Sequence, residues 1–262
     1  MADFAGFTRA MLDKQGLGEI GIAPDETTSW YRFHERGYAS AIANHAAAMK
    51  NLGLITSDGF INFRPGRWFA DWRAAGIDML RQRNPKLHAW VTSQSWSKMD
   101  VDMLNEIRGK IYATKVNGLI LWAAVQRPAK WVGGDPNPGT AFNIDEQGNV
   151  SVRPGYYWYK QVTRAGQPGM AVADVASNDG EVLALACSRN RTKSPDAFVI
   201  SNIRNVPRTV SIRATGTDAR SFEAFRSSAN EGYATAGRAQ PADGTITYIA
   251  PARSATTFFA EK

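Results

Sequence analysis

The sequence has few residues that could form covalent or metal cross-links. It contains one cysteine, Cys187, among 262 residues, and its three histidines are scattered along the chain. A single thiol excludes an internal disulfide, and three separated histidines without a second cysteine form no recognisable zinc motif. We therefore expect no cofactor and no metal, and a core that is stabilised by side-chain packing alone.

Long apolar runs and concentrated charge are absent as well. No run of about 18 apolar residues occurs, and the N-terminal segment "MADFAGFTRAMLDKQGLGEIG" has no basic stretch followed by an unbroken apolar one. These absences predict no membrane association and a protein that stays in the cytoplasm where it is made. The net charge is +7, but the basic residues are dispersed among acidic ones, which argues against a nucleic-acid partner.

The first half of the chain alternates short apolar runs with amphipathic stretches. With 44% apolar and 21% charged residues, the composition is that of a globular protein of one large or two modest domains. Alternating strands and helices indicate parallel β/α units. Predicted strands cover residues 19–23, 54–56, 87–91 and 118–125, and predicted helices cover 4–14, 37–53, 69–83 and 100–115.

After about residue 155 the apolar pattern changes to a period of two. Seven short candidate strands are separated by Gly, Pro, Asn and Asp, which is typical of an antiparallel β-sandwich. They cover residues 170–176, 181–187, 197–203, 209–215, 221–228, 245–250 and 255–260. The Gly- and Pro-rich segment 126–155 predicts a long loop with a small hairpin around "DEQGN". We therefore predict an α/β domain over residues 1–150 and an all-β domain over 151–262.

Four local strings are distinctive, namely "LGLITSDGF" (52–60), "NGLILWAAVQRP" (117–128), "YYWYKQVTRAGQPGMAV" (156–172) and "APARSATTFF" (250–259). Together they resemble the back half of glycoside hydrolase family 30, a clan A family. The resemblance begins near residue 15 and implies a truncated (β/α)8 barrel of about four β/α units followed by the family's β-sandwich. One departure is Asp58, which lies near the place where the family usually has a histidine.

The same resemblance makes "KLHAWVTSQSW" (86–96) the seventh barrel strand, which ends in the family's nucleophilic glutamate. Ser93 occupies that position, or Gln94 if the strand is shifted by one residue, and neither is a carboxylate. The family's acid/base glutamate belongs to the front half of the barrel, which this chain lacks. Since glycoside hydrolysis uses two carboxyl groups about 5 to 9 Å apart, activity requires other acids.

Two carboxylates follow predicted strands and are the expected catalytic pair. Glu26 follows the strand at 19–23 and Asp58 follows the strand at 54–56, and barrel enzymes hold their active sites at the C-terminal ends of the strands. The alternative for Glu26 is the first turn of a helix that Asp25 or Thr27 caps. The alternative for Asp58 is to stabilise the turn before Gly59.

Several aromatic and amide side chains are expected to bind a sugar. Indole rings stack on the apolar faces of sugars, and polar side chains hydrogen-bond to sugar hydroxyls. The predicted substrate-binding residues are Trp30, Ser93, Gln94, Trp96, Trp122, Gln126, Trp131, Asp135 and Asn137. The alternative is that the aromatics are core residues, as we expect for Trp90 and Trp158, and that Asp135 forms a turn before Pro136.

Three functions fit these observations. The first is a glycosidase that acts on β-linked plant polysaccharide, such as xylan or glucan, with a substituted carboxylate pair. The second is an inactive carbohydrate-binding remnant, and the third is an interaction scaffold without a sugar site. The resemblance implies export for many family members, although this chain shows no leader.

A truncated barrel also has consequences for assembly. Four parallel strands leave two open sheet edges and an uncovered apolar face, which is costly in water. We expect a homodimer that covers them. The alternative is an open sheet flanked by helices, with the sandwich packed against one face.

Overall fold

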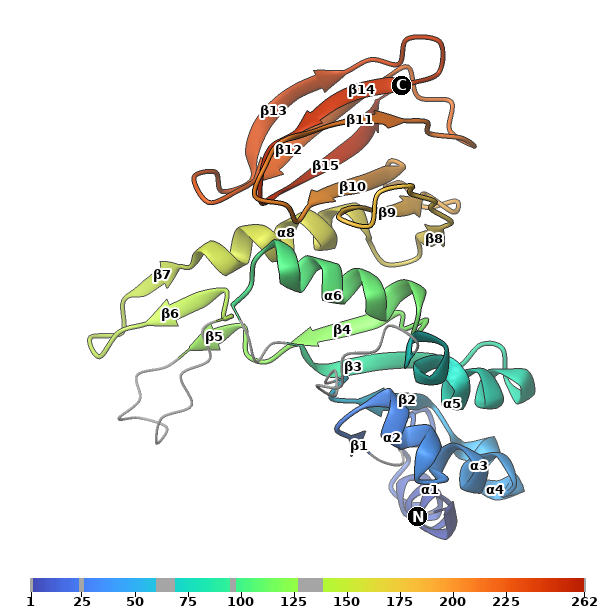
Figure 1. The fold of residues 1–262 in the computed structure, drawn as a ribbon. Helices are drawn as coiled ribbons and strands as arrows, with labels where there is room; N and C mark the ends of the chain where they lie inside the picture. The colour runs from blue at the N-terminus through green and yellow to red at the C-terminus, as the bar shows by residue number, and fades with distance from the viewer. Residues whose placement is uncertain (1, 24–25, 60–68, 95–97, 127–138, 262) are drawn as a thin grey trace. The chain divides into compact units, whose positions relative to one another are not determined.

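Figure 1 shows the computed structural model of the protein, which describes residues 2–23, 26–59, 69–94, 98–126 and 139–261. Helices and strands alternate in the first half of the chain, and the second half is almost entirely strands. None of the described helices has the length and apolar character needed to cross a membrane. The fold class is therefore mixed α/β with several separate sheets.

The chain divides into two compact units. The N-terminal unit comprises Met1–Trp96 and Ile107–Ala123, and the C-terminal unit comprises Ser97–Glu106 and Ala124–Lys262. This division follows contacts in space, so one helix, α6 (Val101–Tyr112), contributes residues to both units. The division into domains at residue 150, which was inferred from the sequence, stays a prediction.

A parallel sheet forms the centre of the N-terminal unit. Its strands are β1 (Glu26–Thr27), β2 (Leu54–Ser57), β3 (His88–Gln94) and β4 (Gly118–Leu121), and they lie in the order β1-β2-β3-β4. All neighbouring pairs are parallel, as the alternation of strands and helices predicted. The predicted strands at 54–56 and 87–91 are therefore confirmed, and the one at 118–125 is confirmed over Gly118–Leu121.

The first predicted strand is displaced. Residues 19–23 form no strand, and only Ile22 makes an isolated parallel bridge, to Leu52. Ile22 is the one buried residue of this segment, so it lacks the run of alternately buried side chains that would hold a strand to the sheet. The strand forms instead at Glu26–Thr27, which places Glu26 in the sheet rather than after it.

The predicted helical segments of this unit are helical, one of them with a break, and a further short helix at Trp30–Glu35 was not predicted. The helices are α1 (Ala2–Lys14), α2 (Trp30–Glu35), α3 (Tyr38–Ala43), α4 (Ala46–Asn51) and α5 (Phe69–Arg83), in addition to α6. The predicted helix over 37–53 is two helices, because His45 adopts an extended conformation and its Nδ1 accepts a hydrogen bond from the amide of Ala48. Such an N-cap begins a new helix at that point.

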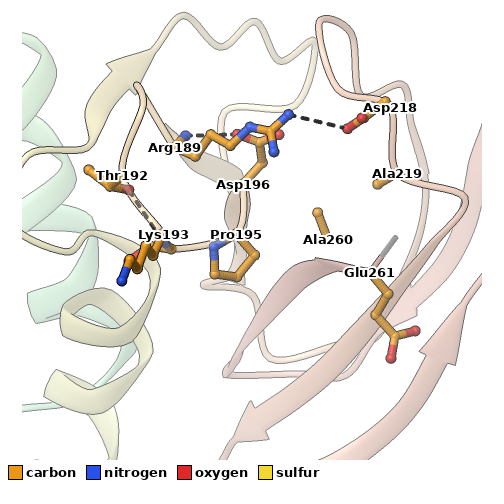
Figure 2. Close-up of a pocket in the computed structure, with 10 residues that line it drawn as sticks. Arg189, Thr192, Lys193, Pro195, Asp196, Asp218, Ala219, Ala260 and Glu261 are labelled. Carbon is orange, nitrogen blue, oxygen red and sulfur yellow. Dashed lines mark hydrogen bonds and ion pairs between the residues drawn. The ribbon is translucent and has the colours of Figure 1, made fainter.

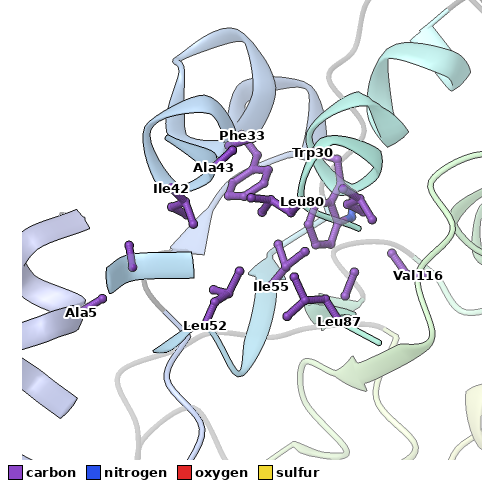
Figure 3. Close-up of a cluster of buried hydrophobic side chains, with 14 of the residues drawn as sticks. Ala5, Trp30, Phe33, Ile42, Ala43, Leu52, Ile55, Leu80, Leu87 and Val116 are labelled. Atoms are coloured by element: carbon purple, nitrogen blue, oxygen red, sulfur yellow. The ribbon is translucent and has the colours of Figure 1, made fainter. Parts of the chain in front are cut away.

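One face of the parallel sheet is covered by helices. Ile55, Ala89 and Val91 of the sheet belong to a buried cluster with Phe33 and Leu80 of the helices, part of which Figure 3 shows. Side chains alternate between the two faces of a strand. The residues between these buried ones therefore lie on the opposite face, which we call the open face. In register across the sheet, the open face carries Glu26, Thr56, Trp90 and Gly118, with Ile120 further along β4.

The C-terminal unit begins with a small sheet and a helix. Strands β5 (Val125–Gln126), β6 (Phe142–Ile144) and β7 (Val150–Val152) form this sheet, and helix α8 (Pro154–Ala165) follows. Strands β6 and β7 are an antiparallel hairpin. Its turn contains Asp145, whose carboxylate accepts hydrogen bonds from the amides of Gln147 and Asn149. The predicted hairpin around "DEQGN" is confirmed.

Two antiparallel sheets make up the rest of this unit. The larger has the order β13-β12-β15-β10-β9-β8, and the smaller pairs β11 with β14. The strands are β8 (Ala171–Ala173), β9 (Val182–Ser188), β10 (Ala197–Asn202), β11 (Arg208–Ile212), β12 (Ser221–Ser227), β13 (Ala234–Ala239), β14 (Ile246–Ala250) and β15 (Ser254–Glu261). Phe198, Phe222 and Phe258 of the larger sheet share a core with Ile246 of the smaller one. All seven predicted strands are present.

Strand β13 was missed because its sequence, "ATAGRA", has no large apolar side chain that could show a period of two. It is an edge strand that pairs only with β12 among the described strands. Its position therefore depends on backbone hydrogen bonds to a neighbour that is far more apolar, and local sequence does not reveal such a neighbour.

Gly118 of β4 provides a test of the packing on the open face. A Cβ atom at this position would lie 2.5 Å from Cδ1 of the Trp90 ring. We expect Gly118→Ala to lower the free energy of unfolding by about 1–3 kcal/mol, because the ring must move. Gly109→Ala in α6 is the control, since its Cβ would meet no atom within 4 Å. Urea unfolding of both variants measures the difference, and equal midpoints would contradict this packing.

Candidate functional site

The C-terminal ends of the four parallel strands lie along one edge of the sheet. Strands β1 to β4 run in the same direction, so Thr27, Ser57, Gln94 and Leu121 end them at this edge. In sheets of this kind, ligands bind outside the carboxyl ends of the strands. This edge is therefore the place where the predicted site residues are compared with the structure.

Glu26 and Asp58 lie on neighbouring strands at this edge. Glu26 is opposite Thr56, and the amide of Asp58 donates a 2.9 Å hydrogen bond to the carbonyl oxygen of Thr27, so the chain continues beside β1. Asp58 is two residues beyond Thr56 and thus has the same facing as Glu26. With strands about 4.8 Å apart and a rise of about 3.3 Å per residue, their Cα atoms are roughly 8 Å apart. By backbone register, the two residues occupy neighbouring positions at this edge of the sheet.

The turn after β2 is stabilised by Ser57. The buried Ser57 hydroxyl donates a hydrogen bond to the carbonyl oxygen of Thr27 (2.8 Å) and accepts one from the amide of Gly59 (3.0 Å). Gly59 has a φ of 69°, and a Cβ there would lie 2.8 Å from a methyl group of Val91. The alternative role for Asp58, stabilising this turn, is thus filled by Ser57. Among the described residues, the half-buried Asp58 carboxylate has no hydrogen bond or ion pair.

The alternative role for Glu26 is also filled by another residue. Helix α2 begins at Trp30, and the hydroxyl of Ser29 caps it by accepting a hydrogen bond from the amide of Arg32. Glu26 therefore lies in strand β1, where it is exposed, and not in the first turn of a helix.

A β-bulge near the end of β3 separates the roles of Ser93 and Gln94. Val91 is opposite Leu119 and Gln94 is opposite Leu121, so Thr92 and Ser93 together face one residue of β4. An extra residue of this kind reverses the facing of everything after it. Thr92 and Ser93 lie on the open face, whereas Gln94 lies on the helix-covered face.

Gln94 is consequently a structural residue. Its side chain is 1% exposed, and its Oε1 accepts a 2.5 Å hydrogen bond from the buried ammonium group of Lys110 in α6. A side chain buried against a helix has no surface to offer a sugar. The prediction that Gln94 binds substrate is therefore wrong, because the bulge turns it away from the open face.

The described tryptophans divide between the core and the open face. Trp30 is 2% exposed and makes an edge-to-face contact with Phe33 in the core, so its predicted role in stacking on a sugar is wrong. Trp122 follows β4 and is 46% exposed, and its amide donates a hydrogen bond to the carbonyl oxygen of Gln94. Trp90, expected in the core, is half-buried on the open face.

Two polar atoms of β3 lack partners. Nε1 of Trp90 and Oγ1 of Thr92 have no hydrogen bond within the described part of the chain. Buried polar groups in folded proteins are nearly always paired, so these two buried atoms are exceptions to that rule. Sequence reasoning missed both residues. The period of two from His88 to Thr92 is the signal that would have placed them on one face.

The other predicted binding residues do not join this group. Trp96, Trp131, Asp135 and Asn137 lie outside the described residues, and the half-buried Gln126 ends β5 in the C-terminal unit. Among the described residues, no cluster of His, Cys, Asp and Glu could hold a metal ion. The candidate site consists of six residues of the N-terminal unit, namely Glu26, Asp58, Trp90, Thr92, Ser93 and Trp122.

A separate pocket of about 310 Å³ lies in the C-terminal unit, between the loop that follows β9 and the end of β15 (Figure 2). Its carboxylates already have partners. Asp196 accepts hydrogen bonds from the amide of Arg189 and the hydroxyl of Thr217, and Asp218 lies 3.7 Å from the Arg189 guanidinium. No aromatic side chain lines it. It therefore lacks the stacking surface that a sugar site requires.

Comparison with known proteins shows what this fold is similar to. No protein-family model and no curated protein sequence matches the chain. Among solved structures, a family 30 subfamily 8 xylanase from Clostridium acetobutylicum superposes on 99% of the chain with a TM-score of 0.74 and 18% identity. A family 30 endoxylanase from Clostridium papyrosolvens C71 superposes on 96% with a TM-score of 0.73 and 16% identity. An endo-β1,6-glucanase superposes on 100% with a TM-score of 0.61 and 16% identity.

The likeness is to part of each enzyme. The chain spans 59% of the length of both xylanases and 53% of that of the glucanase. At these identities the comparison establishes the fold and not the activity. The resemblance to glycoside hydrolase family 30 that the sequence indicated is thus confirmed for the fold, as a partial family 30-like structure.

The hydrogen bond between Lys110 and Gln94 can be tested separately from activity. Lys110→Met removes a buried donor from the Gln94 side chain, so we expect a loss of about 1–3 kcal/mol in the free energy of unfolding. Lys115→Met is the control, because Lys115 pairs with Asp78 at 2.9 Å on the surface, where both side chains are at least 40% exposed. Such a pair contributes less than about 1 kcal/mol. Equal losses in urea unfolding would contradict the assignment.

Proposed function

We propose that the protein is a glycoside hydrolase-like protein that acts on β-linked plant polysaccharide such as xylan or glucan. The fold comparison supports this proposal, since the similar enzymes are described as xylanases and a glucanase. The proposal includes a truncated barrel of about four β/α units over residues 1–150 and a β-sandwich over residues 151–262. Its site is the open face at the C-terminal edge of the parallel sheet.

The observation that carries the proposal is the pair of carboxylates on neighbouring strands. Glycosidases use two carboxyl groups that are about 5–5.5 Å apart when they retain configuration and about 6.5–9.5 Å apart when they invert it. The Cα separation of roughly 8 Å from strand geometry lets Glu26 and Asp58 reach either range through their side-chain torsions. Two acids with the same facing are the minimum that this chemistry requires.

The surroundings of the two acids suggest different roles. Asp58 is half-buried and its backbone amide is hydrogen-bonded to Thr27, which fixes the main chain of Asp58 beside β1. A carboxylate that no other side chain holds remains available as a nucleophile. Glu26 is exposed, so its proton exchanges readily with water, and it suits the general acid and base.

The proposed reaction has two steps. In the first, an oxygen of Asp58 forms a bond to the anomeric carbon, the glycosidic bond breaks, and Glu26 donates its proton to the leaving oxygen. In the second, Glu26 takes a proton from water, the water oxygen bonds to the anomeric carbon, and the bond to Asp58 breaks. The hydroxyl of Ser93 would bind a sugar hydroxyl, and the rings of Trp90 and Trp122 would stack on the sugar.

A second candidate function is carbohydrate binding without hydrolysis. The observation that favours it is Ser93, which lies on the open face at the position where the family resemblance places a glutamate. A serine hydroxyl can bind a sugar but does not act as a nucleophile without a neighbouring base. With Ser93 at this position, the open face would still bind an oligosaccharide but would not hydrolyse it.

The catalytic pair is tested by the hydrolysis of aryl β-glycosides, xylan and glucan. We expect Glu26→Gln and Asp58→Asn each to lower kcat on the order of 10²-fold or more, because each removes a proton donor or a nucleophile. Glu19→Gln, an exposed carboxylate of the same unit, is the control and should leave the rate unchanged. Unchanged rates in both site variants of an active protein would remove Glu26 and Asp58 from the mechanism.

Sugar binding is tested by titration with xylo- and gluco-oligosaccharides, followed by tryptophan fluorescence and by calorimetry. We expect Trp122→Ala to weaken binding roughly two- to ten-fold, since the stacking of one ring contributes about 0.5–1.5 kcal/mol. Val150→Ala, an exposed apolar residue of β7, is the control. Binding without hydrolysis would support the second candidate, and a flat response to both sugars would favour a scaffold without a sugar site.

A further inference from the structure

Helix α6 carries a charged residue at a position where its pattern predicts a core residue. Ile107 is 2% exposed, and Lys110 follows it by three residues, so both side chains lie on the same side of the helix. Lys110 is 4% exposed. Taking an ammonium group out of water is costly, and lysine is rarely buried for that reason. The position of Lys110 therefore requires an explanation other than apolar packing.

The partner of Lys110 lies at the end of β3. Nζ of Lys110 donates a 2.5 Å hydrogen bond to Oε1 of Gln94, which is 1% exposed. Apolar side chains of similar volume often stabilise a fold as well as a buried polar or ionic pair does, so stability alone does not account for this pair. The best-attested use of such buried groups is to select one register among alternatives. This pair lies where the register of β3 against β4 changes.

The end of β3 could pair with β4 in two ways. In the observed register, Thr92 and Ser93 together face one residue of β4, so Ser93 lies on the open face and Gln94 on the helix-covered face. Without the extra residue, Ser93 would be opposite Leu121 and would face the helices, and Gln94 would lie on the open face. The two registers therefore exchange the positions of Ser93 and Gln94.

The contacts of Gln94 show what distinguishes the two registers. Its backbone carbonyl accepts a 3.1 Å hydrogen bond from the amide of Trp122, but the carbonyl of Ser93 could take that place in the other register, because the backbone repeats at every residue. Oγ1 of Thr92 has no hydrogen-bond partner within the described part of the chain, so it does not hold the bulge. Among these contacts, the side-chain bond to Lys110 is the one that requires the observed register.

We infer that Lys110 is a positioning residue of the candidate site. Its hydrogen bond to Gln94 holds that side chain on the helix-covered face, selects the bulged register of β3, and thereby turns the hydroxyl of Ser93 to the open face. What this hydroxyl binds rests on the proposed function. The choice of register does not depend on any activity, and it is tested separately.

The register also decides which polar group the site presents to a ligand. In the bulged register this is the hydroxyl of Ser93, a single oxygen that both donates and accepts hydrogen bonds. In the other register it is the amide of Gln94, which has separate donor and acceptor groups at the end of a longer side chain. A sugar hydroxyl that is bonded to Ser93 in the first arrangement loses that contact in the second.

The register is tested by labelling Ser93→Cys with a maleimide in the full chain. Mass spectrometry of the labelled peptides separates the introduced thiol from Cys187, which is 7% exposed. We expect the addition of Lys110→Met to slow labelling at position 93 on the order of ten-fold, because burial against the helices lowers the fraction of thiolate. A role in stability alone predicts the opposite, since a loosened fold exposes the thiol more often.

Matched variants in the Ser93→Cys background complete this test. Lys110→Met combined with Gln94→Leu should restore the labelling rate, because an apolar side chain at position 94 again prefers the helix-covered face. Lys115→Met, which removes a surface ammonium group, is the control and should not change the rate. Lys110→Ala gives the same reading if Lys110→Met does not fold. Unchanged or faster labelling in the Lys110 single variants with native circular dichroism, or slow labelling in the combined variant, contradicts the inference.

Calorimetry with xylo-oligosaccharides links the register to the site. We expect Lys110→Met and Ser93→Ala each to weaken binding roughly two- to ten-fold, since each removes one hydrogen bond to the sugar. The double variant should lose no more than either single one, because both changes act through the same hydroxyl. Losses that add would overturn the role of Lys110 in the site. If the wild-type chain binds no sugar, the proposed function fails, whereas the labelling rates still decide the register.

Discussion

The extra residue at the C-terminal end of β3 decides how the whole candidate site is arranged. Because Thr92 and Ser93 together face one residue of β4, every side chain after them is turned to the opposite face. Ser93 thereby joins the open face, and Gln94 is buried against Lys110 of α6. Without the bulge, the amide of Gln94 would lie on the open face and Ser93 would face the helices. A shift of one residue in register therefore decides whether Ser93 or Gln94 lies on the open face.

Small side chains make the close contacts of the same region possible. Ser57 fills the buried turn after β2 with two hydrogen bonds, and Gly59 beside it allows the side chain of Val91 to approach. Gly118 accommodates the ring of Trp90 across the sheet. Because Ser57 satisfies the backbone around the turn, the carboxylate of Asp58 is left without a structural partner among the described residues. Ser57 thus stabilises the turn, and the adjacent Asp58 remains available for the proposed reaction.

The sequence predicted most of the elements but was less reliable for the site. The strands at 54–56 and 87–91 and the seven antiparallel strands were identified because apolar periodicity is a local property. The strand at 19–23 was misplaced because pairing depends on a neighbouring strand, and β13 was missed because its small residues show no period. The pairing of Asp58 with Glu26 as catalytic residues stays a prediction, and Glu26 lies in β1 rather than after the strand expected at 19–23. Trp30 was wrongly assigned to the ligand because the sequence does not show which face of α2 meets the core.

Composition, periodicity and short motifs are properties of consecutive residues, so the amino-acid sequence alone indicates an α/β half, an all-β half and a resemblance to glycoside hydrolase family 30. The set of side chains that share the open face became visible only after the strands were paired. Facing depends on the register between strands that are about 30 residues apart in the chain, and register is set by backbone hydrogen bonds and by single-residue bulges. The sequence of one strand reveals neither its register nor its bulges. The faces on which Trp90, Ser93 and Gln94 lie therefore follow only from the pairing of β3 with β4.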